Sequence, residues 1–284
     1  MSNQGSNQNN NTSIAVLSYN ICFQAMTNYS GGSASELGRK CTYIRNSRLT
    51  ICGNNMATMI DAIPASMNIP ALDFVGFQEA SRWKELQGDA TGTLNKMQAI
   101  GSKEGRSEMV SFYDGAKYTL TKQYFGRFLI DRPFQILFFK SNAVDNGVIF
   151  INAHNPHGYS FCKMQAALSS AIENRITDEE KKYQIIAVGD FNETSWDWQS
   201  NSMKQNSWTP FSELNLFTSI SVGAPVFSCS QADGVWSDGQ GGIRKGSRGG
   251  DYIFSSGAAA DIKVPPAYDP KLLQSDHLPI VAIV

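Results

Sequence analysis

Short apolar runs bounded by polar and turn-forming residues recur along the chain from residue 14 onward. Runs of this length that are rich in Val, Ile, Phe and Tyr predict β-strands. Polar residues between two of the strongest runs, at 142–147, predict a turn. The expected strands are Ile14–Tyr19, Leu72–Phe77, Met109–Tyr113, Tyr118–Leu129, Phe134–Phe139, Val148–Ala153, Gln184–Val188, Tyr252–Ser255, Asp261–Val264 and Pro279–Val284.

Two segments instead show the three- and four-residue apolar spacing of amphipathic helices. One is Leu49–Ile63, which is expected to close at Pro64 because proline lacks the backbone N–H that a helix needs. The other is Lys163–Ile176. Strands outnumber helices without a regular βαβ alternation, which indicates an α+β fold or layered sheets with helices outside. Loops are expected at 194–210 and 239–250, and mixed loop and helix at 80–103.

Composition places the chain among globular proteins and limits its partners. It has 284 residues, 42% hydrophobic and 17% charged, so length alone allows one domain or two. The net charge of −1 provides no global positive field for nucleic acid, although a local basic patch could bind it. Residues 1–12 form a polar tail that is expected to be disordered and lacks signal-peptide features. No apolar run approaches the ~18 residues that cross a membrane.

Polar residues follow four of the expected strands and frame two later ones. One polar strand end is usually a cap or a turn, but six that carry Asn, Glu, Asp and His indicate a shared site at one rim of a sheet. Carboxylate and amide oxygens suit Mg²⁺, and a histidine beside an aspartate can donate to phosphate or act as a base. The six groups are Ser18-Tyr19-Asn20, Gly76-Phe77-Gln78-Glu79, Ile151-Asn152-Ala153-His154, Val188-Gly189-Asp190-Phe191-Asn192, Gly250-Asp251-Tyr252 and Ser275-Asp276-His277.

Sequence motifs of other common hydrolytic chemistries are missing. The chain has no Gly-x-Ser-x-Gly elbow and no Cys–His pairing motif, so acyl transfer has no support. It also lacks a GxxxxGK[ST] loop, which argues against NTP-driven chemistry. The remaining residue types are compatible with a Mg²⁺ site and with contacts to a phosphate group.

The motifs SYNI, GFQEA, NAHNPHG, VGDFNE, GGDYIF and SDHLPI occur in this order from residue 18 almost to residue 284. Each is weak alone, but the ordered set resembles the endonuclease/exonuclease/phosphatase superfamily. That superfamily includes pancreatic-type deoxyribonucleases, apurinic endonucleases, deadenylases, inositol polyphosphate 5-phosphatases and neutral sphingomyelinases. The resemblance implies a two-sheet β-sandwich flanked by helices, a four-layer αββα arrangement, with the site at one end. Because Asn20 and His277 must then meet, residues 13–284 are expected to form a single catalytic domain.

The resemblance also implies a metal site. Glu79 would be the main ligand of Mg²⁺, with Mn²⁺ as an alternative. Asn20 would lie beside Glu79, and Asp276 would lie close to the metal. Some nucleases of the superfamily place an aspartate two residues after the first asparagine, where this chain has Cys22. That additional metal contact is therefore not expected here.

The remaining roles that the resemblance implies concern water and phosphate. Asp190 would orient or deprotonate the attacking water, and Asn192 would hold that water or a phosphate oxygen. His277, oriented by Asp251, would contact the phosphate, and His154 would donate to the phosphate or the leaving group. The metal and the histidines would neutralise charge that develops on the phosphate oxygens, while Asp190 aims the water.

Substrate contacts are expected at the rim of the site, each with a plain structural alternative. Arg244 and Arg248 could clamp a second phosphate or a nucleic-acid backbone, or belong to a solvated loop. Trp196 could stack a base or pin its loop by packing. Arg132 could reach phosphate or form a surface ion pair. His157 could contact substrate or cap its loop.

Cysteine usage and one glycosylation signal favour an intracellular setting. The cysteines are odd in number and lack CxxC spacing, which argues against a zinc site or a full disulfide framework. Cys41 and Cys52 could pair, but buried thiols in a reducing compartment are the expected state. A glycan on the Asn192 sequon would block the predicted site. The five cysteines are Cys22, Cys41, Cys52, Cys162 and Cys229.

Three functions remain open at this point. The first is a Mg²⁺-dependent phosphodiesterase or nuclease with water as the nucleophile and nucleic acid as its expected partner. The second is a phosphomonoesterase that acts on an inositol phosphate, a phospholipid headgroup or a nucleotide, which the near-neutral charge favours. The third is a catalytically silent binding module on the same scaffold, for which one expects a missing acid or histidine. The sequence indicates no obligate protein partner.

Overall fold

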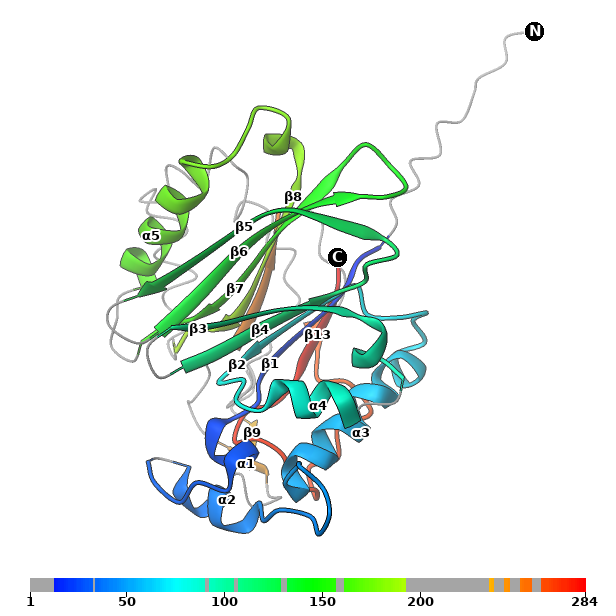
Figure 1. The fold of residues 1–284 in the computed structure, drawn as a ribbon, viewed down its shortest axis with the longest axis vertical. Coiled ribbons are helices and arrows are strands. Elements are labelled where there is room, and N and C mark those ends of the chain that lie inside the picture. The colour runs from blue at the N-terminus through cyan, green and yellow to red at the C-terminus, as the bar shows by residue number, and fades with distance from the viewer. Residues whose placement is uncertain are drawn as a thin grey trace, which may run out of the picture.

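Two β-sheets packed face to face form the centre of the molecule, and helices cover their outer faces (Figure 1). The six-stranded sheet has the order β12 (Ile262–Lys263), β13 (Ile280–Ile283), β1 (Ala15–Asn20), β2 (Phe74–Gln78), β4 (Ser107–Tyr113), β3 (Gln98–Glu104). The five-stranded sheet has the order β11 (Asp251–Ser255), β8 (Gln184–Asp190), β7 (Gly147–His154), β6 (Arg132–Ser141), β5 (Tyr118–Phe128). A separate antiparallel pair consists of β9 (Val235–Ser237) and β10 (Ile243–Lys245). The computed structural model describes residues 13–32, 34–89, 92–104, 107–128, 132–156, 161–192, 235–237, 243–245, 251–256 and 262–284.

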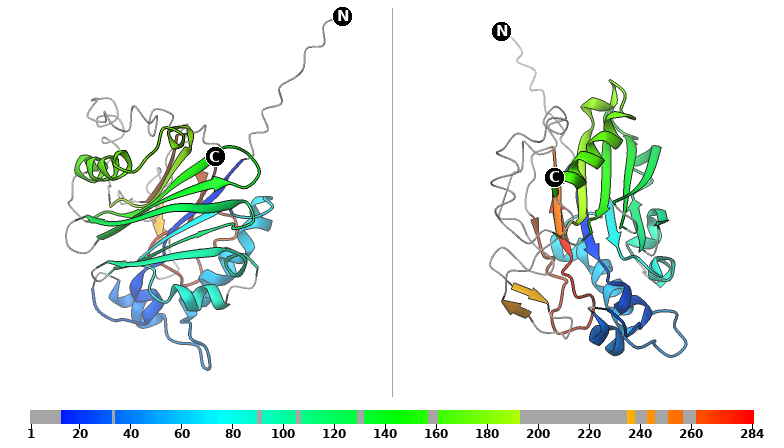
Figure 2. Two further views of the ribbon diagram at one scale, coloured as in Figure 1. Left: turned by 45° about the horizontal axis from the view of Figure 1, so that its top comes forward. Right: turned by 90° about the vertical axis from the view of Figure 1, so that its left-hand side faces the viewer.

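The α-helices lie on the outer faces of the two sheets, and α3 and α5 are the longest of those described (Figure 1). Figures 1 and 2 show α5 beside the five-stranded sheet and the other α-helices gathered beside the six-stranded sheet. Within the described residues, no helix combines the length and the apolar character needed to cross a bilayer. The α-helices are α1 (Phe23–Thr27), α2 (Ser35–Lys40), α3 (Ile51–Met67), α4 (Trp83–Asp89) and α5 (Phe161–Glu173), and the 3₁₀ helices are η1 (Leu94–Lys96) and η2 (Glu180–Lys182).

Three apolar layers hold these four layers of secondary structure together. Side chains alternate along β1, so Leu17 packs toward α1–α4 whereas Val16 packs between the sheets. In the gap between the sheets, the ring of Phe74 from β2 stacks on that of Phe150 from β7, with centroids 5.1 Å apart. The third layer joins α5 to β6, β7 and β8. The expected two-sheet sandwich flanked by helices is therefore confirmed.

Each sheet contributes one parallel pair of strands, and these pairs position the polar strand ends. β1 runs parallel to β2, with Asn20 opposite Gln78. β7 runs parallel to β8, with His154 opposite Asp190. Parallel neighbours end at the same edge of a sheet, so residues far apart in sequence are delivered to one place. β1 also pairs with the C-terminal strand β13, which lies beside it in Figure 1.

A buried polar seam ties the two sheets together just behind those strand ends. Gln78 Nε2 donates to Asn152 Oδ1 across the gap at 2.7 Å. The Asn152 amide donates in turn to the backbone oxygen of Val110 at 3.0 Å and to Ser111 Oγ at 3.2 Å. Ser111 Oγ then donates to Gln135 Oε1 at 2.6 Å. These hydrogen bonds fix one relative position of the layers, because any other position would leave more of the buried amide groups unpaired.

The expected helix boundary at Pro64 is wrong, because α3 continues to Met67 with Pro64 inside it. Proline removes one backbone donor, and here it does so in the last turn of the helix. Ile60 and Ile63 on the same helix are fully buried, so packing of the apolar face outweighs one lost hydrogen bond. Segment 80–103 ends in strand β3, and the expected loop at 239–250 contains β10. Residues 194–210 lie outside the described part of the chain.

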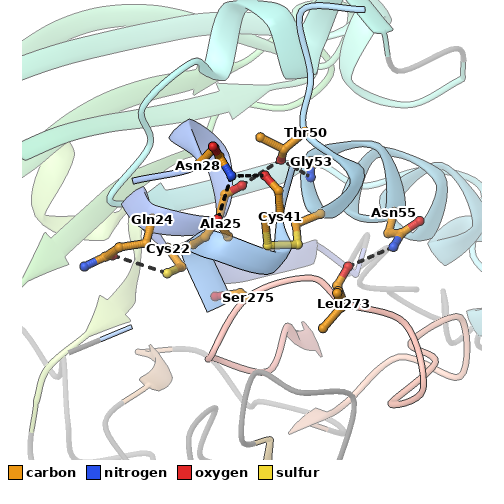
Figure 3. Close-up of a disulfide and its surroundings, with 12 residues drawn as sticks. Cys22, Gln24, Ala25, Asn28, Cys41, Thr50, Gly53, Asn55, Leu273 and Ser275 are labelled. Atoms are coloured by element: carbon orange, nitrogen blue, oxygen red, sulfur yellow. Dashed lines mark hydrogen bonds between the residues drawn. A yellow bond between two sulfur atoms is a disulfide. The ribbon is translucent and has the colours of Figure 1, made fainter. Parts of the chain in front are cut away.

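The expectation of reduced thiols is wrong for Cys41 and Cys52, which form a disulfide (Figure 3). Cys41 follows α2 and Cys52 lies in the first turn of α3, and their Cα atoms are 5.3 Å apart. Asn28 reinforces this corner, since its amide donates to the backbone oxygen of Cys41 at 3.2 Å. Cys22 is a buried free thiol. Tertiary structure brings the paired cysteines together, and their spacing alone carries no signal for it.

Candidate active site

The C-terminal segment closes the site against both sheets. Asp251 at the start of β11 lies directly opposite Asp190 at the end of β8. His277 lies three residues before β13. Ser275 Oγ donates to the backbone oxygen of Asn20 at 2.7 Å and accepts from the backbone N–H of His277 at 3.1 Å. This hydroxyl therefore fixes His277 to the end of β1.

Asp190 is a buried carboxylate whose two oxygens are both held. Asn20 Nδ2 donates to its Oδ2 at 3.0 Å, and the backbone N–H of Asn192 donates to its Oδ1 at 2.9 Å. The Nε2 atoms of His154 and His277 lie 3.5 and 3.8 Å from the same Oδ2. Burial alone would raise the pKa of Asp190, but the two imidazoles and the two hydrogen bonds bring it below the usual value. The result is an oriented anion that can accept a proton.

His277 and Asp251 form a hydrogen-bonded dyad. His277 Nδ1 lies 2.8 Å from Asp251 Oδ2, and the Asp251 side chain is fully buried. Its Nε2 consequently faces the site, 3.8 Å from Asp190 Oδ2 and 4.0 Å from Asp276 Oδ1. Burial raises the pKa of Asp251 to about 7, against the opposing effect of His277 and with a further contribution from Asp190. The dyad orients the imidazole toward the place where a phosphate would lie.

Glu79 points into the site from the six-stranded sheet. Its Oε2 accepts from the backbone N–H of Phe23 at 3.0 Å. Its Oε1 lies 3.6 Å from Arg132 Nη1 and 3.9 Å from His154 Nε2. Burial raises the pKa of Glu79, and the nearby carboxylate of Asp276 raises it further. Two acids at this position therefore favour an additional cation between them.

Arg132 determines which nitrogen of His154 carries the proton. Arg132 Nη1 lies 3.2 Å from His154 Nδ1. A guanidinium has donors only, so His154 Nδ1 must accept, and the imidazole proton belongs on Nε2. That Nε2–H faces Asp190 Oδ2 and Glu79 Oε1. The buried His154 thus presents a donor toward the centre of the site.

Strained backbone is concentrated at the strand ends of the site. Cys22, Glu79 and Asn192 have φ of 58°, 51° and 50°, a left-handed conformation that costs a non-glycine residue about 1–3 kcal/mol. Gly189 has φ 155°, and a Cβ there would lie 1.9 Å from the backbone oxygen of Ala153. Glycine is therefore required for β8 to approach β7 and bring Asp190 beside His154. The strain at Cys22 and Glu79 carries no sequence signal, because neither residue type predicts it.

Comparison with known proteins identifies the family. A model of the Endonuclease/Exonuclease/phosphatase family matches residues 17–277. The chain belongs to this family. Members of the endonuclease/exonuclease/phosphatase family hydrolyse phosphate esters, and the match spans every residue of the site described above. The family expected from the six motifs is therefore confirmed.

Three proteins show similarity to this chain in sequence or in fold. An uncharacterized protein, L684 of Acanthamoeba polyphaga mimivirus, is 32% identical over 190 residues, or 63% of this chain and 34% of the viral protein. The match therefore spans about a third of that curated relative. ANGEL2, described as a 2′,3′-cyclic phosphatase, has a TM-score of 0.62 at 14% identity, covering 95% of this chain and 94% of its own. The mannosyl-6-phosphatase Bt3783 of Bacteroides thetaiotaomicron has a TM-score of 0.52 at 17% identity, covering 96% and 100%. At these identities the solved structures show a shared fold.

The donor set of this family member fits a hard divalent cation. Glu79 and Asp276 supply carboxylate oxygens, and the raised pKa of Glu79 indicates charge that a cation would compensate. Asn20 Oδ1 accepts from the backbone N–H of Cys22 at 3.0 Å and retains a second lone pair on its oxygen. Cys22 itself is a poor ligand, because burial, Asp276 and Glu79 raise its pKa well above the usual value.

A second acidic group could in principle also hold a cation. Ligand atoms of Asp190, Asp251 and His277 all lie within 4.8 Å of one another. The 2.8 Å contact between His277 Nδ1 and Asp251 contributes to that proximity, and it leaves Nε2 as the nitrogen of this group that faces the site. The oxygen-rich set around Glu79 is the better match to Mg²⁺ chemistry.

Asn155 belongs to the site and was not singled out from the sequence. Its backbone N–H donates to the backbone oxygen of Asp190 at 2.8 Å. Its side-chain Nδ2 donates to the backbone oxygen of Phe191 at 3.0 Å. Asn192 Nδ2 donates to the backbone oxygen of Asn155 at 2.6 Å. Asn192 therefore braces the segments that follow β7 and β8 through one hydrogen bond of its amide. The signal available was the second asparagine of the NAHNPHG motif.

Most of the predicted site residues meet in one place. Of the residues predicted at the rim of the site, Arg132 lies within it, and the structure does not describe the side chains of the others. Asn20, Glu79, His154, Asp190 and His277 converge, with Asp251 and Asp276 behind or beside them. Arg132 joins this group through Glu79 and His154. Arg244 lies in β10, but its side chain is not described. Residues outside the described part of the chain are His157, Trp196 and Arg248.

Proposed function

We propose that this protein is a divalent-metal-dependent phosphodiesterase in which Asp190 directs water at the scissile phosphate. The observation that carries the proposal is the environment of Asp190, a buried carboxylate held by Asn20 and Asn192 between two imidazoles. A carboxylate fixed in this way can take a proton from water and hold the oxygen in line with the phosphate. Its lowered pKa keeps it ionised at neutral pH.

The two histidines serve the phosphate from different sides of this water. His277, oriented by Asp251, presents Nε2 to a phosphate oxygen. His154 presents the Nε2–H that the contact with Arg132 imposes, which suits donation to the departing oxygen. Preorganised donors of this kind stabilise developing charge because they need no rearrangement during the reaction.

A Mg²⁺ ion would be held by Glu79 and Asp276, with the amide oxygen of Asn20 beside it. When bound, this ion would supply Lewis-acid stabilisation of phosphate charge. Mn²⁺, which accepts the same oxygen ligands, is the alternative. Donor chemistry and the raised pKa of Glu79 support the site.

Charge favours a diester over a monoester as the substrate. A phosphate monoester carries close to two negative charges near pH 7, whereas a diester carries one. Among the described residues that surround the site, Arg132 is the one permanent cation. The site also contains four acids, so it offers little positive charge of its own to a doubly charged phosphate. The four acids are Glu79, Asp190, Asp251 and Asp276. Nucleic acid is the diester that we favour as the partner. Contacts from His157, Trp196, Arg244 and Arg248 remain part of that proposal.

A phosphomonoesterase is the second candidate, because the similar Bacteroides structure is described as a mannosyl-6-phosphatase. A silent binding module is disfavoured, because every acid and histidine that the motifs predict is present in the chain.

The test compares bis(p-nitrophenyl) phosphate with p-nitrophenyl phosphate, in Mg²⁺ and in EDTA. We expect metal-dependent hydrolysis of the diester that exceeds that of the monoester. Asp190→Asn should lower kcat at least about 100-fold. The matched control is Asp178→Asn, since Asp178 is almost fully exposed and pairs with Lys181 at the surface. A preference for the monoester would establish the second candidate, and full activity of Asp190→Asn would refute the mechanism.

A further inference from the structure

A pocket opens beside the site on the side of Glu79 and Arg132. Its volume is about 360 Å³, near the lower end of the range for small-molecule sites. The side chains that complete its walls include Phe23, Tyr29 and Glu108. Because Glu79 and Arg132 belong to both the pocket and the site, a group joined to the scissile phosphate would enter it. The mechanism above makes no use of Phe23, Tyr29 or Glu108.

Tyr29 is an aromatic wall held in a fixed position. Its ring packs edge-on against Phe23, with centroids 5.5 Å apart and planes at 61°. The backbone at Gly31 touches the ring, since a Cβ there would lie 2.6 Å from three of the Tyr29 ring and hydroxyl atoms. Gln24 Nε2 anchors that backbone by donating to the Gly31 oxygen at 3.2 Å. Even so, 53% of Tyr29 remains exposed. A rigid, exposed ring beside a phosphate site is suited to stacking.

Charge limits what can occupy the pocket. Glu108 and Glu79 place two carboxylates in its walls. Arg132, the cation among the described residues of the walls, already contacts Glu79 and His154. A carboxylate offers several acceptor positions, so amino, hydroxyl or ring N–H groups can donate to Glu108 beside the partner that it already has, whereas a second phosphate group would meet a like charge there. The pocket therefore selects an uncharged group that carries hydrogen-bond donors.

We propose that this pocket binds the nucleoside attached to the scissile phosphate, with its base stacked on Tyr29 and a base or sugar donor directed to Glu108. The proposal rests on the phosphodiesterase function above and specifies the substrate class of that site. A nucleobase offers both the flat face that Tyr29 requires and the polar N–H groups that Glu108 requires. The small volume suits one nucleoside. The pocket would therefore contact the group next to the phosphate and no more distant part of the substrate.

The test measures competitive inhibition of bis(p-nitrophenyl) phosphate hydrolysis in Mg²⁺. The inhibitors are ethyl phosphate, glucose 6-phosphate, adenosine 5′-monophosphate and adenosine 3′-monophosphate. For the wild-type protein, we expect one of the two adenosine phosphates to have an inhibition constant at least about 10-fold lower than that of ethyl phosphate. Tyr29→Ala should remove that advantage and leave inhibition by ethyl phosphate unchanged. Tyr29→Phe, which keeps the ring, should retain it.

Tyr43→Ala is the matched control. Tyr43 is also a half-exposed tyrosine, but it lies under the Arg82 guanidinium, outside the walls of the pocket. The control should behave as the wild type. Glu108→Gln should weaken inhibition by the adenosine phosphate about threefold or more, because a charged acceptor becomes a neutral one.

Equal inhibition by ethyl and adenosine phosphates, or an advantage that survives Tyr29→Ala, would overturn the proposal. A larger advantage for glucose 6-phosphate would overturn it in favour of a hexose. These outcomes differ from failure of the proposed function, which would appear as missing metal-dependent hydrolysis of bis(p-nitrophenyl) phosphate itself.

Discussion

At the scale of single residues, the site depends on partners that set proton positions. In the proposed mechanism, His154 donates toward substrate because Arg132 occupies its other nitrogen, and His277 faces the phosphate because Asp251 occupies its Nδ1. Neither partner needs to touch the substrate to matter. The tautomer and orientation of each imidazole follow from what lies behind it.

Replacing Arg132 with Met should uncouple this arrangement. Without the guanidinium, His154 Nδ1 loses its donor and the proton can move to it, so kcat should fall about 10-fold or more. Nitrogen NMR of labelled histidine should show protonation at Nε2 in the wild type and a mixture in the variant. Arg127→Met, at an exposed position on β5, is the control. A wild-type His154 protonated at Nδ1 would contradict the assignment.

The raised pKa of Asp251 predicts a pH-dependent contribution to stability. Burial raises it to about 7, above the ordinary value of about 3.9 for an unfolded chain. The folded state therefore binds this proton more tightly than the unfolded state. Its contribution to the free energy of unfolding is full below pH 4 and is lost as pH rises through 7.

Asp251→Asn should flatten that profile, because the amide does not titrate. Urea unfolding in EDTA at several pH values between 4 and 8 would measure the difference. A variant whose free energy of unfolding falls with pH as steeply as that of the wild type would exclude Asp251 as the source.

At the scale of elements, glycine decides how closely β7 and β8 can approach. Gly189→Ala should lower the free energy of unfolding by roughly 2–4 kcal/mol and reduce activity, because the new Cβ collides with the Ala153 oxygen at a positive φ. Gly88→Ala in α4 is the opposite case, since nothing lies within 4 Å of its Cβ position. It should stabilise by up to about 1 kcal/mol. Thermal melting and kcat of the two variants test whether the first is destabilised and the second stabilised. Equal changes in stability in the two variants would refute the argument.

The disulfide between α2 and α3 should stabilise the corner that carries Tyr29. It closes a loop with a sequence separation of 11, and reduction should cost about 2–3 kcal/mol of unfolding free energy. Denaturant unfolding with and without dithiothreitol would measure this. The double variant Cys41→Ser, Cys52→Ser should lose the response to the reductant. An unchanged response would assign it to another cysteine.

Sequence patterns predicted long elements well and short ones poorly. Apolar runs such as Val148–Ala153 carry their own signal, whereas α1 and α2, with five and six residues, are too short for a helical repeat. The convergence of the acids and histidines was predicted because they follow apolar strands in a recognisable order. The contact of Arg132 with His154 was not, because it depends on how β6 and β7 pair in space. The sequence left the pairing of Cys41 with Cys52 as the less favoured alternative for the same reason.

At the scale of the whole molecule, the site belongs to neither sheet alone. Asn20 and Glu79 come from the six-stranded sheet, and His154 and Asp190 come from the five-stranded sheet. The polar seam of Gln78, Asn152, Ser111 and Gln135 fixes the two sheets relative to each other.

Asn152→Ala should therefore act on stability and activity together. It leaves Gln78 Nε2 and Ser111 Oγ without their Asn152 partner, which should cost about 2–4 kcal/mol and lower kcat even though Asn152 does not line the site. Asn142→Ala, at an exposed turn, is the control. Chemical unfolding and kinetics at one temperature would separate the two effects. A variant with lower stability and normal kcat would show that the seam holds the fold without setting the site.

The division of the site between two sheets also bears on how the protein would lose activity when it is heated. Distances between side chains of the site depend on the spacing between the two sheets. The Nε2 atom of His154 and the Oε1 atom of Glu79, for example, face each other across the gap between the sheets at 3.9 Å. Swelling of that gap by a fraction of an ångström would pull acid and imidazole apart while every strand still kept its neighbours. Inactivation would then come before melting.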